Sequence, residues 1–444
     1  METSSRAHRV MQAMEATMKS AFDLMDTPTL DAEIASLESH VEGVRARNLS
    51  LDMARGKPSP EQTNLSRPML DLLSSSSDFT AAGGVADNYG FPDGLPKTRE
   101  LAAELLDVDP ANVVVSGSSS LHLMHDLVVH GYTRGVAGHT PWCKQDTVKW
   151  LCPSPGYDRH FRVTETYGIQ NIPIPMNSDG PDMDLVEQFV NNDSSVKGIW
   201  CVPKYANPNG ITYSDEVVCR FAALKPAALD FRIYWDNAYI VHDLYDESDQ
   251  LLNIFDAMRE AGTSNLVYEF ASTSKVTFPG SGLAWVTADP QDMVEVRETL
   301  AVEQVGPEKL TQLAHVLFLR DAVGVRAHMK KHAAIVRPRF ELVERKLSEG
   351  LSELHVASWS HPRGGYFVSF DGPEGSARAI VSLMAELGVK MTDAGATWPS
   401  GIDPHDTNIR IAPTYPSLEE LSSALDVFVL VVKLVSARLA RANR

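Results

Sequence analysis

Short apolar runs alternate with stretches of helical periodicity through the middle of the chain, and this alternation limits the possible folds more than any other feature. Seven runs predict strands, because each is short, apolar and bounded by polar turn residues. They are residues 112–115, 147–151, 169–175, 196–202, 231–235, 266–271 and 284–287. Strands that alternate with helices predict an α/β fold, in which a mostly parallel or mixed sheet of seven strands lies between helices.

The last third of the chain has a different pattern. Helical periodicity covers residues 310–326, 333–351 and 418–439, and residues 364–370 and 408–412 predict strands. This mixture indicates a second, smaller α+β domain. We therefore expect a helical N-terminal extension at 1–45, a small domain from 46–85 and 325–444, and a large domain at 86–324.

Polar loops follow four of the predicted strands directly. They carry Ser116, Asn207, Asp236 and Lys275. In open α/β sheets, ligands bind outside the carboxyl ends of the strands. One polar loop there would mean little, but four with these residue types point to one shared site.

Lys275 ends the sequence Ser272-Thr273-Ser274-Lys275, which follows a predicted strand. Burial disfavours the ammonium form of a lysine, and the neutral amine is a nucleophile that forms Schiff bases with carbonyl compounds. On this stretch alone, a solvated loop lysine is the more ordinary interpretation, because the Ser-x-x-Lys pattern is common.

A loop of small hydroxyl residues, 116–120, lies between a predicted strand and a helical stretch. A helix start offers free N–H groups and the positive end of the helix dipole, so this arrangement suits a phosphate group. A helix capped by serine explains the same pattern equally well. The sequence leaves both interpretations open.

Composition excludes several classes of partner. The net charge of -18 argues against nucleic acid and anionic membranes as general partners, and no apolar run reaches the length of a membrane span. No Cys-x-x-Cys pair is present and no histidine spacing fits a zinc site, so we expect free thiols, a cytoplasmic location and no metal.

Ten motifs give the chain a family resemblance. They are ARGKPSPEQ, NYGFPDG, SGSSSL, CPSPGYDRHF, ANPNG, YWDNAYIVH, STSKVTFPGSG, VGPEKLTQLAH, GGYF and NIRIAP. With them the chain resembles the fold-type I pyridoxal phosphate enzymes of the class I aminotransferase group, and within it the bacterial aspartate aminotransferases of subgroup Ic. The resemblance covers about residues 51–439, and residues 1–45 have no counterpart in it.

The resemblance implies a role for each residue around the cofactor ring. Lys275 would form the aldimine with pyridoxal 5'-phosphate and carry the proton between substrate and cofactor. Asp236 would pair with the protonated pyridine nitrogen. Asn207 and Tyr239 would bond the 3′ oxygen of the ring, and Tyr157 would stack on its face.

The resemblance also implies how the phosphate and the substrate are held. Arg410 would bind the α-carboxylate of the substrate, beside Asn207 and the backbone of Gly56. Tyr89 would reach the phosphate in a neighbouring subunit, which implies a homodimer with shared active sites. The phosphate-binding residues of the same subunit would be Ser118, Ser119, Ser120 and Ser272.

The implied activity is transfer of an amino group between an amino acid, aspartate or glutamate, and a 2-oxo acid. The chain departs from the wider group by having Leu283 where an arginine binds phosphate. It also has Glu303 and Gln304, and no arginine, where aspartate enzymes bind the distal carboxylate of the substrate. The candidates to replace that arginine are Lys309, Lys57, Arg55 and Arg159.

Two alternatives remain at this point. Glu303 beside the side-chain pocket would favour a neutral or cationic amino acid, and the same fold also supports elimination, replacement or carbon–carbon bond chemistry in secondary metabolism. A non-catalytic binding protein of the same fold is the other alternative. The presence of Lys275, Asp236 and Arg410 speaks against a non-catalytic protein.

Overall fold

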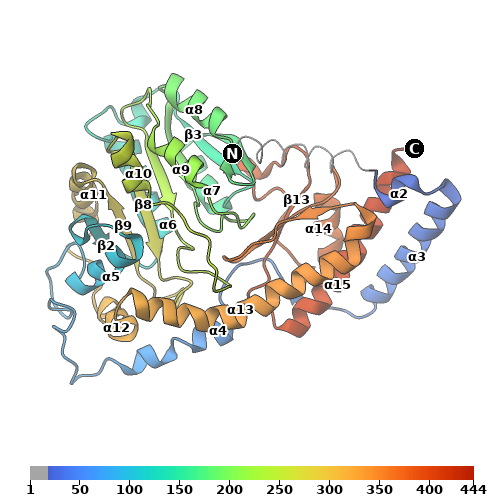
Figure 1. Cartoon of the computed structure of the whole chain (residues 1–444), viewed down its shortest axis with the longest axis horizontal. Helices are drawn as coiled ribbons and strands as arrows, with labels where there is room; N and C mark the ends of the chain where they lie inside the picture. Colours follow the sequence, from blue (N-terminus) through green and yellow to red (C-terminus); the bar gives the residue numbers. More distant parts are fainter. Residues whose placement is uncertain (1–18) are drawn as a thin grey trace.

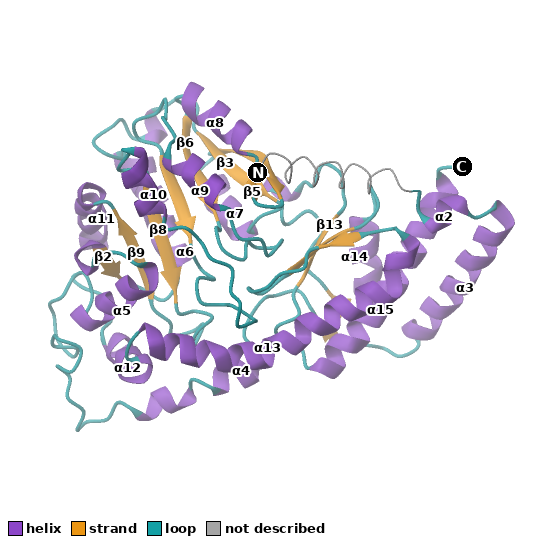
Figure 2. Ribbon diagram, in the orientation of Figure 1, coloured by secondary structure: helices purple, strands orange, loops and turns teal. Residues whose placement is uncertain are grey.

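The central sheet contains eight strands in the order β2-β9-β8-β7-β6-β3-β4-β5 (Figures 1 and 2). This computed structural model describes residues 19–444. The strands are β2 (Val113–Val115), β3 (Lys149–Ser154), β4 (Gln170–Asn177), β5 (Gly180–Pro181), β6 (Val196–Cys201), β7 (Arg232–Asp236), β8 (Val267–Ser272) and β9 (Ala284–Ala288). All seven predicted strands are present. The eighth, β5, was not predicted, because two residues are too few to form a pattern.

The sheet is mixed. Strands β4, β3, β6, β7 and β8 are parallel, whereas β9 is antiparallel to both β8 and β2, and β5 is antiparallel to β4. The carboxyl ends of β6, β7 and β8 therefore lie at one edge of the sheet, and the loops that leave them start close together. This confirms the mostly parallel architecture expected from the sequence.

Helices cover both faces of this sheet (Figure 1). Alternate side chains of β7 point to opposite faces: Trp235 packs in an apolar cluster with α8–α10, and Tyr234 packs in another with α6 and α11. The helices are α5 (Pro96–Leu106), α6 (Ser120–Arg134), α7 (Asp158–Thr166), α8 (Met183–Asn192), α9 (Asp215–Ala222), α10 (Ile254–Ala261), α11 (Pro290–Glu303) and α12 (Leu310–Leu319).

The smaller part of the molecule contains two small sheets. One is antiparallel, with β10 (Ser358–Trp359), β11 (Val368–Asp371) and β13 (Asn408–Ile411); in the other, β1 (Leu51–Asp52) pairs in parallel with β12 (Val389–Lys390). Its helices are α2 (Ala21–Leu24), α3 (Thr27–Arg45), α4 (Pro60–Asn64), α13 (Ala322–Leu351), α14 (Ala377–Glu386) and α15 (Leu418–Ala442). Short 3-10 helices are η1 (Arg67–Asp71), η2 (Pro110–Asn112), η3 (Trp142–Lys144), η4 (Ser352–Leu354) and η5 (Pro399–Gly401).

Helix α3 belongs to the core of this smaller part. Its side chains Leu30, Leu37 and Val41 are buried in the apolar cluster that includes residues of α13 and α15. Asp26 caps the helix by accepting a hydrogen bond from the backbone N–H of Thr29. The predicted extension is therefore helical from 27 to 45, whereas residues 1–18 lie outside the described part. The predicted domain boundaries at 45, 85 and 325 stay a proposal.

One predicted helix, 310–326, is divided in two. Helix α12 ends at Leu319, and Arg320 has a φ of 69°, a left-handed conformation that a helix cannot contain. The side chain of Asp321 then caps α13 by accepting a hydrogen bond from the backbone N–H of Gly324. No proline marks this break, so the periodicity alone did not show it. Helix α13 runs from the large part to the small one (Figure 1).

Helix α12 holds the loop that follows β8. The Nδ1–H of His315 donates to the backbone carbonyl of Thr311 (2.7 Å), which leaves Nε2 to accept from the hydroxyl of Thr277 (2.8 Å). The hydroxyl of Thr273 lies 3.2 Å from the same nitrogen. Burial lowers the pKa of His315 to about 4. The imidazole is therefore neutral at pH 7, as acceptance by Nε2 requires.

Among residues 19–444, no helix is both long and apolar enough to cross a membrane.

Removal of the Leu30 side chain should destabilise the smaller part. Leu30 is fully buried, so Leu30→Ala leaves a cavity and should lower the free energy of unfolding by about 2–5 kcal/mol. Urea unfolding followed by circular dichroism measures this change. Leu24→Ala is the matched control, because Leu24 is 71% exposed, and it should change the value by about 0.5 kcal/mol or less. Equal effects of the two substitutions would contradict the packing of α3 described above.

His315 should make stability depend on pH. Its pKa of about 4 in the folded chain lies below the ordinary value of 6.5, so the unfolded chain binds more protons between these pH values. The stabilisation is complete above pH 6.5 and is lost as the pH falls toward 4. Between pH 7.5 and 5, His315→Gln should therefore lose about 2 kcal/mol less than the unsubstituted chain. Urea unfolding at both pH values tests this, and identical losses would rule the histidine out.

Candidate active site

A cavity of about 570 Å³ lies between the strand ends of the large sheet and the smaller part of the molecule. The predicted site residues that line it are Gly56, Ser119, Ser120, Tyr157, Asn207, Asp236, Tyr239, Ser272, Lys275 and Arg410. Two predicted residues, Ser118 and Tyr89, do not line it. Of the four polar strand-end residues, Asn207, Asp236 and Lys275 thus meet at one place. Ser116 does not line the cavity, and its hydroxyl accepts a hydrogen bond from Gln304.

Asp236, the last residue of β7, is a buried carboxylate with one free oxygen. Its Oδ2 accepts a hydrogen bond from His160 Nε2 at 3.0 Å, and the His160 ring stacks on Trp200 with centroids 4.7 Å apart. No residue in the described part of the chain donates to Oδ1, which is fully buried. A buried polar atom without a partner is costly. This oxygen is therefore suited to accept a hydrogen bond from a ligand N–H group in the cavity.

Lys275 lies in the loop after β8 and extends over two aromatic rings. Its Nζ is 4.8 Å from the ring centroid of Tyr239 and 5.9 Å from that of Tyr366. Burial lowers the pKa of Lys275, whereas the charge of Asp236 acts in the opposite direction. The neutral, nucleophilic amine is thus more populated than in an exposed lysine.

Two tyrosines of the cavity remain protonated. Burial raises the pKa of Tyr239 well above its ordinary value and that of Tyr157 to about 12, and the negative charge of Asp236 adds to both effects. Each phenol therefore keeps its hydroxyl proton near neutral pH. Tyr239 can donate a hydrogen bond to an anionic oxygen of a ligand.

The serine loop forms a second polar region of the cavity. Helix α6 begins at Ser120, and Ser119 occupies the cap position without making a side-chain cap hydrogen bond. The interpretation of this loop as a simple serine cap is therefore wrong. The free N–H groups of the helix start, with the hydroxyls of Ser119 and Ser120, are available to an anion such as phosphate. Ser272 also lines this region, but its hydroxyl donates to that of Ser274.

Ser118 has a different position from the one expected. Its side chain is exposed, and its backbone carbonyl accepts a hydrogen bond from the hydroxyl of Ser274 at 2.9 Å. Ser274 in turn receives a hydrogen bond from Ser272 at 3.1 Å. In this structure Ser118 fixes the lysine loop to the serine loop through its backbone.

Arg410 enters the cavity from β13 in the smaller part. Its Nη1 donates to Asp158 Oδ1 at 3.0 Å and to Asn207 Oδ1 at 3.2 Å, and its Nε lies 3.4 Å from the hydroxyl of Thr392. Its guanidinium carbon is 4.8 Å from the ring centroid of Phe367. The sequence did not single out Asp158 or Thr392. Asp158 directly follows Tyr157 in a recognised motif, which was the available signal.

Gly56 lies against the ring of Phe367. A Cβ atom at this position would come within 2.3 Å of the ring, so a larger residue would displace the ring that lies beside Arg410. Gly56 and Arg410 thus both contact Phe367, and the predicted role of both in binding the substrate α-carboxylate stays a prediction.

Several cations line the cavity and could pair with a second carboxylate. Of the four candidates, Arg55, Lys57 and Arg159 line it, and Lys57 Nζ also lies 3.7 Å from the ring centroid of Tyr415. Lys309 does not line it; this residue is buried just before α12. Lys390 lines the cavity and was missed, because nothing in its local sequence marks it.

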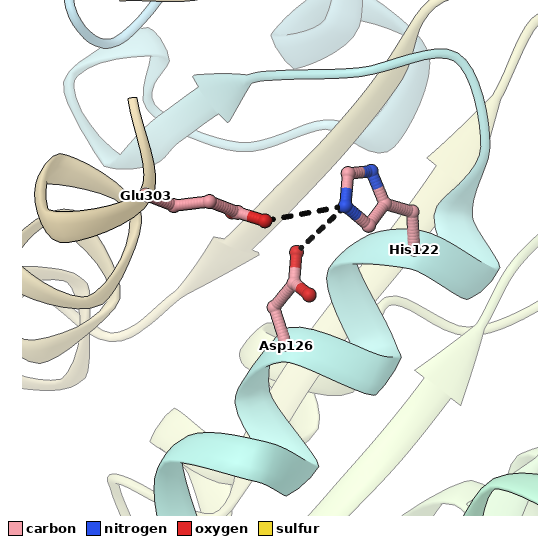
Figure 3. A group of neighbouring side chains, drawn as sticks. All are labelled: His122, Asp126 and Glu303. Atoms are coloured by element: carbon pink, nitrogen blue, oxygen red, sulfur yellow. Dashed lines mark ion pairs between the residues drawn. The ribbon is translucent and has the colours of Figure 1, made fainter. Parts of the chain in front are cut away.

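Glu303 faces helix α6 and does not line the cavity. The Nε2 atom of His122 lies 3.4 Å from Glu303 Oε1 and 3.3 Å from Asp126 Oδ2 (Figure 3). Burial raises the pKa of Asp126. The imidazole of His122 thus contacts both acidic side chains directly, and the predicted absence of a metal stays a prediction. The suggestion that Glu303 pairs with a cationic substrate has no support in this geometry.

Tyr89 is 80% exposed and lies beside another exposed loop. A Cβ atom on Gly306 would be 3.3 Å from the backbone carbonyl of Gly90, so the two loops are adjacent. Val305 in the second loop is 74% exposed. Tyr89 does not line the cavity of its own chain, and its expected contact with the phosphate of a neighbouring subunit stays a prediction.

Comparison with known proteins identifies the family of the chain. The family model described as aspartate amino-transferase matches residues 25–443, which includes α3 and so extends beyond the resemblance found from motifs alone. A putative aminotransferase of Mycolicibacterium smegmatis is 44% identical over 86% of this chain and 90% of its own length. The aspartate aminotransferase of Corynebacterium glutamicum is 42% identical over 89% of this chain and 91% of its own length.

A solved structure shows the same fold. An aspartate transaminase of Corynebacterium glutamicum superposes with a TM-score of 0.92 at 39% identity, and the match covers 95% of this chain and 99% of the other. The family model, the curated relatives and the solved structure all indicate the same family. The chain therefore belongs to the aspartate aminotransferase family and is a transaminase.

Proposed function

We propose that this transaminase uses pyridoxal 5'-phosphate to move an amino group between aspartate or glutamate and a 2-oxo acid. The observation that carries the proposal is that one cavity contains both Lys275 and the buried Asp236 oxygen that has no partner among the described residues. Lys275 supplies a nucleophilic amine, and Asp236 accepts a hydrogen bond from a ring nitrogen. When bound, the cofactor would supply the electron sink for the reaction.

The chain's own residues would bind and orient both reactants. Asp236, held by His160, would keep a pyridine nitrogen protonated, and Tyr239 and Asn207 would bond the ring oxygen. Lys275 would hold the cofactor and move a proton at the substrate α-carbon. The phosphate would lie at the start of α6, near Ser119, Ser120 and Ser272, with Ser118 contributing from its backbone. Tyr157 would pack against the ring.

Arg410, with the backbone of Gly56 beside it, would bind the α-carboxylate. The distal carboxylate of aspartate or glutamate would need its own cation, because burying it unpaired costs several kcal/mol. Arg55, Lys57, Arg159 and Lys390 supply positive charge around the cavity. The relative from Corynebacterium glutamicum, named as an aspartate aminotransferase, supports the same substrate class. Nothing in the comparisons favours elimination, replacement or carbon–carbon bond chemistry.

We also propose that the enzyme is a cytoplasmic homodimer. All four cysteines are free thiols, as a reducing compartment allows. Three exposed apolar side chains support a dimer: Leu70 is on η1, which contacts α12, and Tyr89 and Val305 are on two adjacent loops. A second copy would cover them. In such a dimer, Tyr89 would complete the phosphate site of the partner.

Aspartate and glutamate should convert the cofactor of the purified holoenzyme to its amine form, which is seen as a shift in the visible absorbance. Alanine and lysine should do so much more slowly, because they lack a distal carboxylate. Lys275→Ala is the control: it should bind cofactor but show no turnover. Rapid conversion by lysine or alanine, with none by aspartate, would show that the proposed substrate is wrong.

Hybrid dimers should show that the two subunits share their sites. Tyr89→Ala and Lys275→Ala should each be inactive or nearly so as pure proteins. After unfolding and refolding together, random pairing should restore about a quarter of the normal activity, since each hybrid holds one intact site. Mixtures that gain no activity would place Tyr89 outside the partner's site.

A further inference from the structure

Arg410 is already paired with a carboxylate of the same chain. Its side chain is 8% exposed, and its Nη1 donates to Asp158 Oδ1 at 3.0 Å and to Asn207 Oδ1. Nε lies near the hydroxyl of Thr392. Within residues 19–444, Nη2 has no hydrogen-bond partner. Arg410 lines the cavity with one terminal nitrogen free of hydrogen bonds to these residues and the other engaged.

A carboxylate binds a guanidinium most strongly through two parallel hydrogen bonds. The free Nη2 supplies one of them, and the second must come from Nη1 or from Nε. We propose that Asp158 is a displaceable internal ligand of Arg410, whose place on Nη1 is taken by the substrate α-carboxylate. This inference rests on the proposed role of Arg410 in binding substrate.

Asp158 is the partner of Arg410 that can be released most easily. Its side chain is 33% exposed and lines the cavity, whereas Asn207 is buried. Its second oxygen, Oδ2, lies 4.0 Å from Arg159 Nε. Asp158 is also the first residue of α7, where the helix dipole favours a negative charge. The released carboxylate therefore keeps two favourable interactions.

This exchange has a physical purpose. A buried guanidinium without a partner is strongly destabilising, so Asp158 keeps Arg410 paired and fixed in position while the site is empty of substrate. The same contact lowers the affinity for every carboxylate ligand, because each ligand must displace a negative charge and then bind close to it. Asp158 thus sets the affinity of the site without taking part in proton transfer.

The test uses the holoenzyme and maleate, an unreactive dicarboxylate, with binding measured by calorimetry. Asp158→Asn keeps a hydrogen-bond acceptor and removes the charge, so maleate should bind roughly tenfold more tightly. Asp158→Ala removes both and should also bind more tightly. In steady-state kinetics, the KM for aspartate should fall in both variants while kcat changes little.

Asp393→Asn is the matched control. Asp393 also lines the cavity but forms no hydrogen bond or ion pair with Arg410 in the described part of the chain, so this change should alter maleate affinity less than twofold. An equal increase in maleate affinity in Asp393→Asn would mean that the loss of any negative charge near the cavity, and not the displacement of Asp158, causes the tighter binding. Unchanged binding in Asp158→Asn, or weaker binding in Asp158→Ala, would show that Asp158 only orients Arg410 and would overturn the inference.

Arg410→Lys separates this inference from the proposed function. If Arg410 binds the α-carboxylate, this variant should bind maleate much more weakly. Unchanged maleate affinity in Arg410→Lys would refute the proposed role of Arg410. If Arg410→Lys binds maleate more weakly but Asp158→Asn does not bind it more tightly, only the displacement of Asp158 by substrate would be refuted.

Discussion

The hydrogen bond between His160 and Asp236 is the interaction on which the rest of the site depends. It joins α7 to the end of β7 and leaves one buried carboxylate oxygen free to face the cavity. Trp200 on β6 stacks on the histidine ring, so residues of α7, β6 and β7 together set the direction of the Asp236 carboxylate. The Asp236 oxygen without a partner lowers the stability of the folded chain, and a ligand that donates a hydrogen bond to it restores that stability.

A second constraint is the use of neutral polar groups behind the lysine loop. His315 on α12 holds the hydroxyls of Thr273 and Thr277, and His328 on α13 lies 2.9 Å from the backbone carbonyl of Val276. Burial lowers the pKa of both histidines. Uncharged groups thus hold the loop both before and after Lys275 in the sequence. They place no further positive charge near the Lys275 amine.

The sequence predicted those features that depend on residues close together along the chain. Each strand of the large sheet has a local apolar pattern, and the polar residues that follow the strands meet because parallel strands end at one edge. The break at Arg320 was missed because arginine rarely adopts a left-handed conformation and no glycine or proline stands there. The contact between Asp158 and Arg410 was missed because it joins residues 252 positions apart. The direction of Glu303, toward His122, depends equally on tertiary packing.

The thirty-residue helix α13 has a consequence for movement within the molecule. It is continuous from the break at Arg320 to Leu351, and its inner face packs against α15 in the core of the smaller part. Its first turns pack in the core of the large part through Val325 and Met329, whereas its later turns pack in the core of the smaller part. Pro338 lies near the change from one core to the other, and its missing backbone N–H makes it the place where the helix bends most easily. Because β13 belongs to the smaller part and the lysine loop to the large one, a bend at Pro338 would change the distance between Arg410 and Lys275.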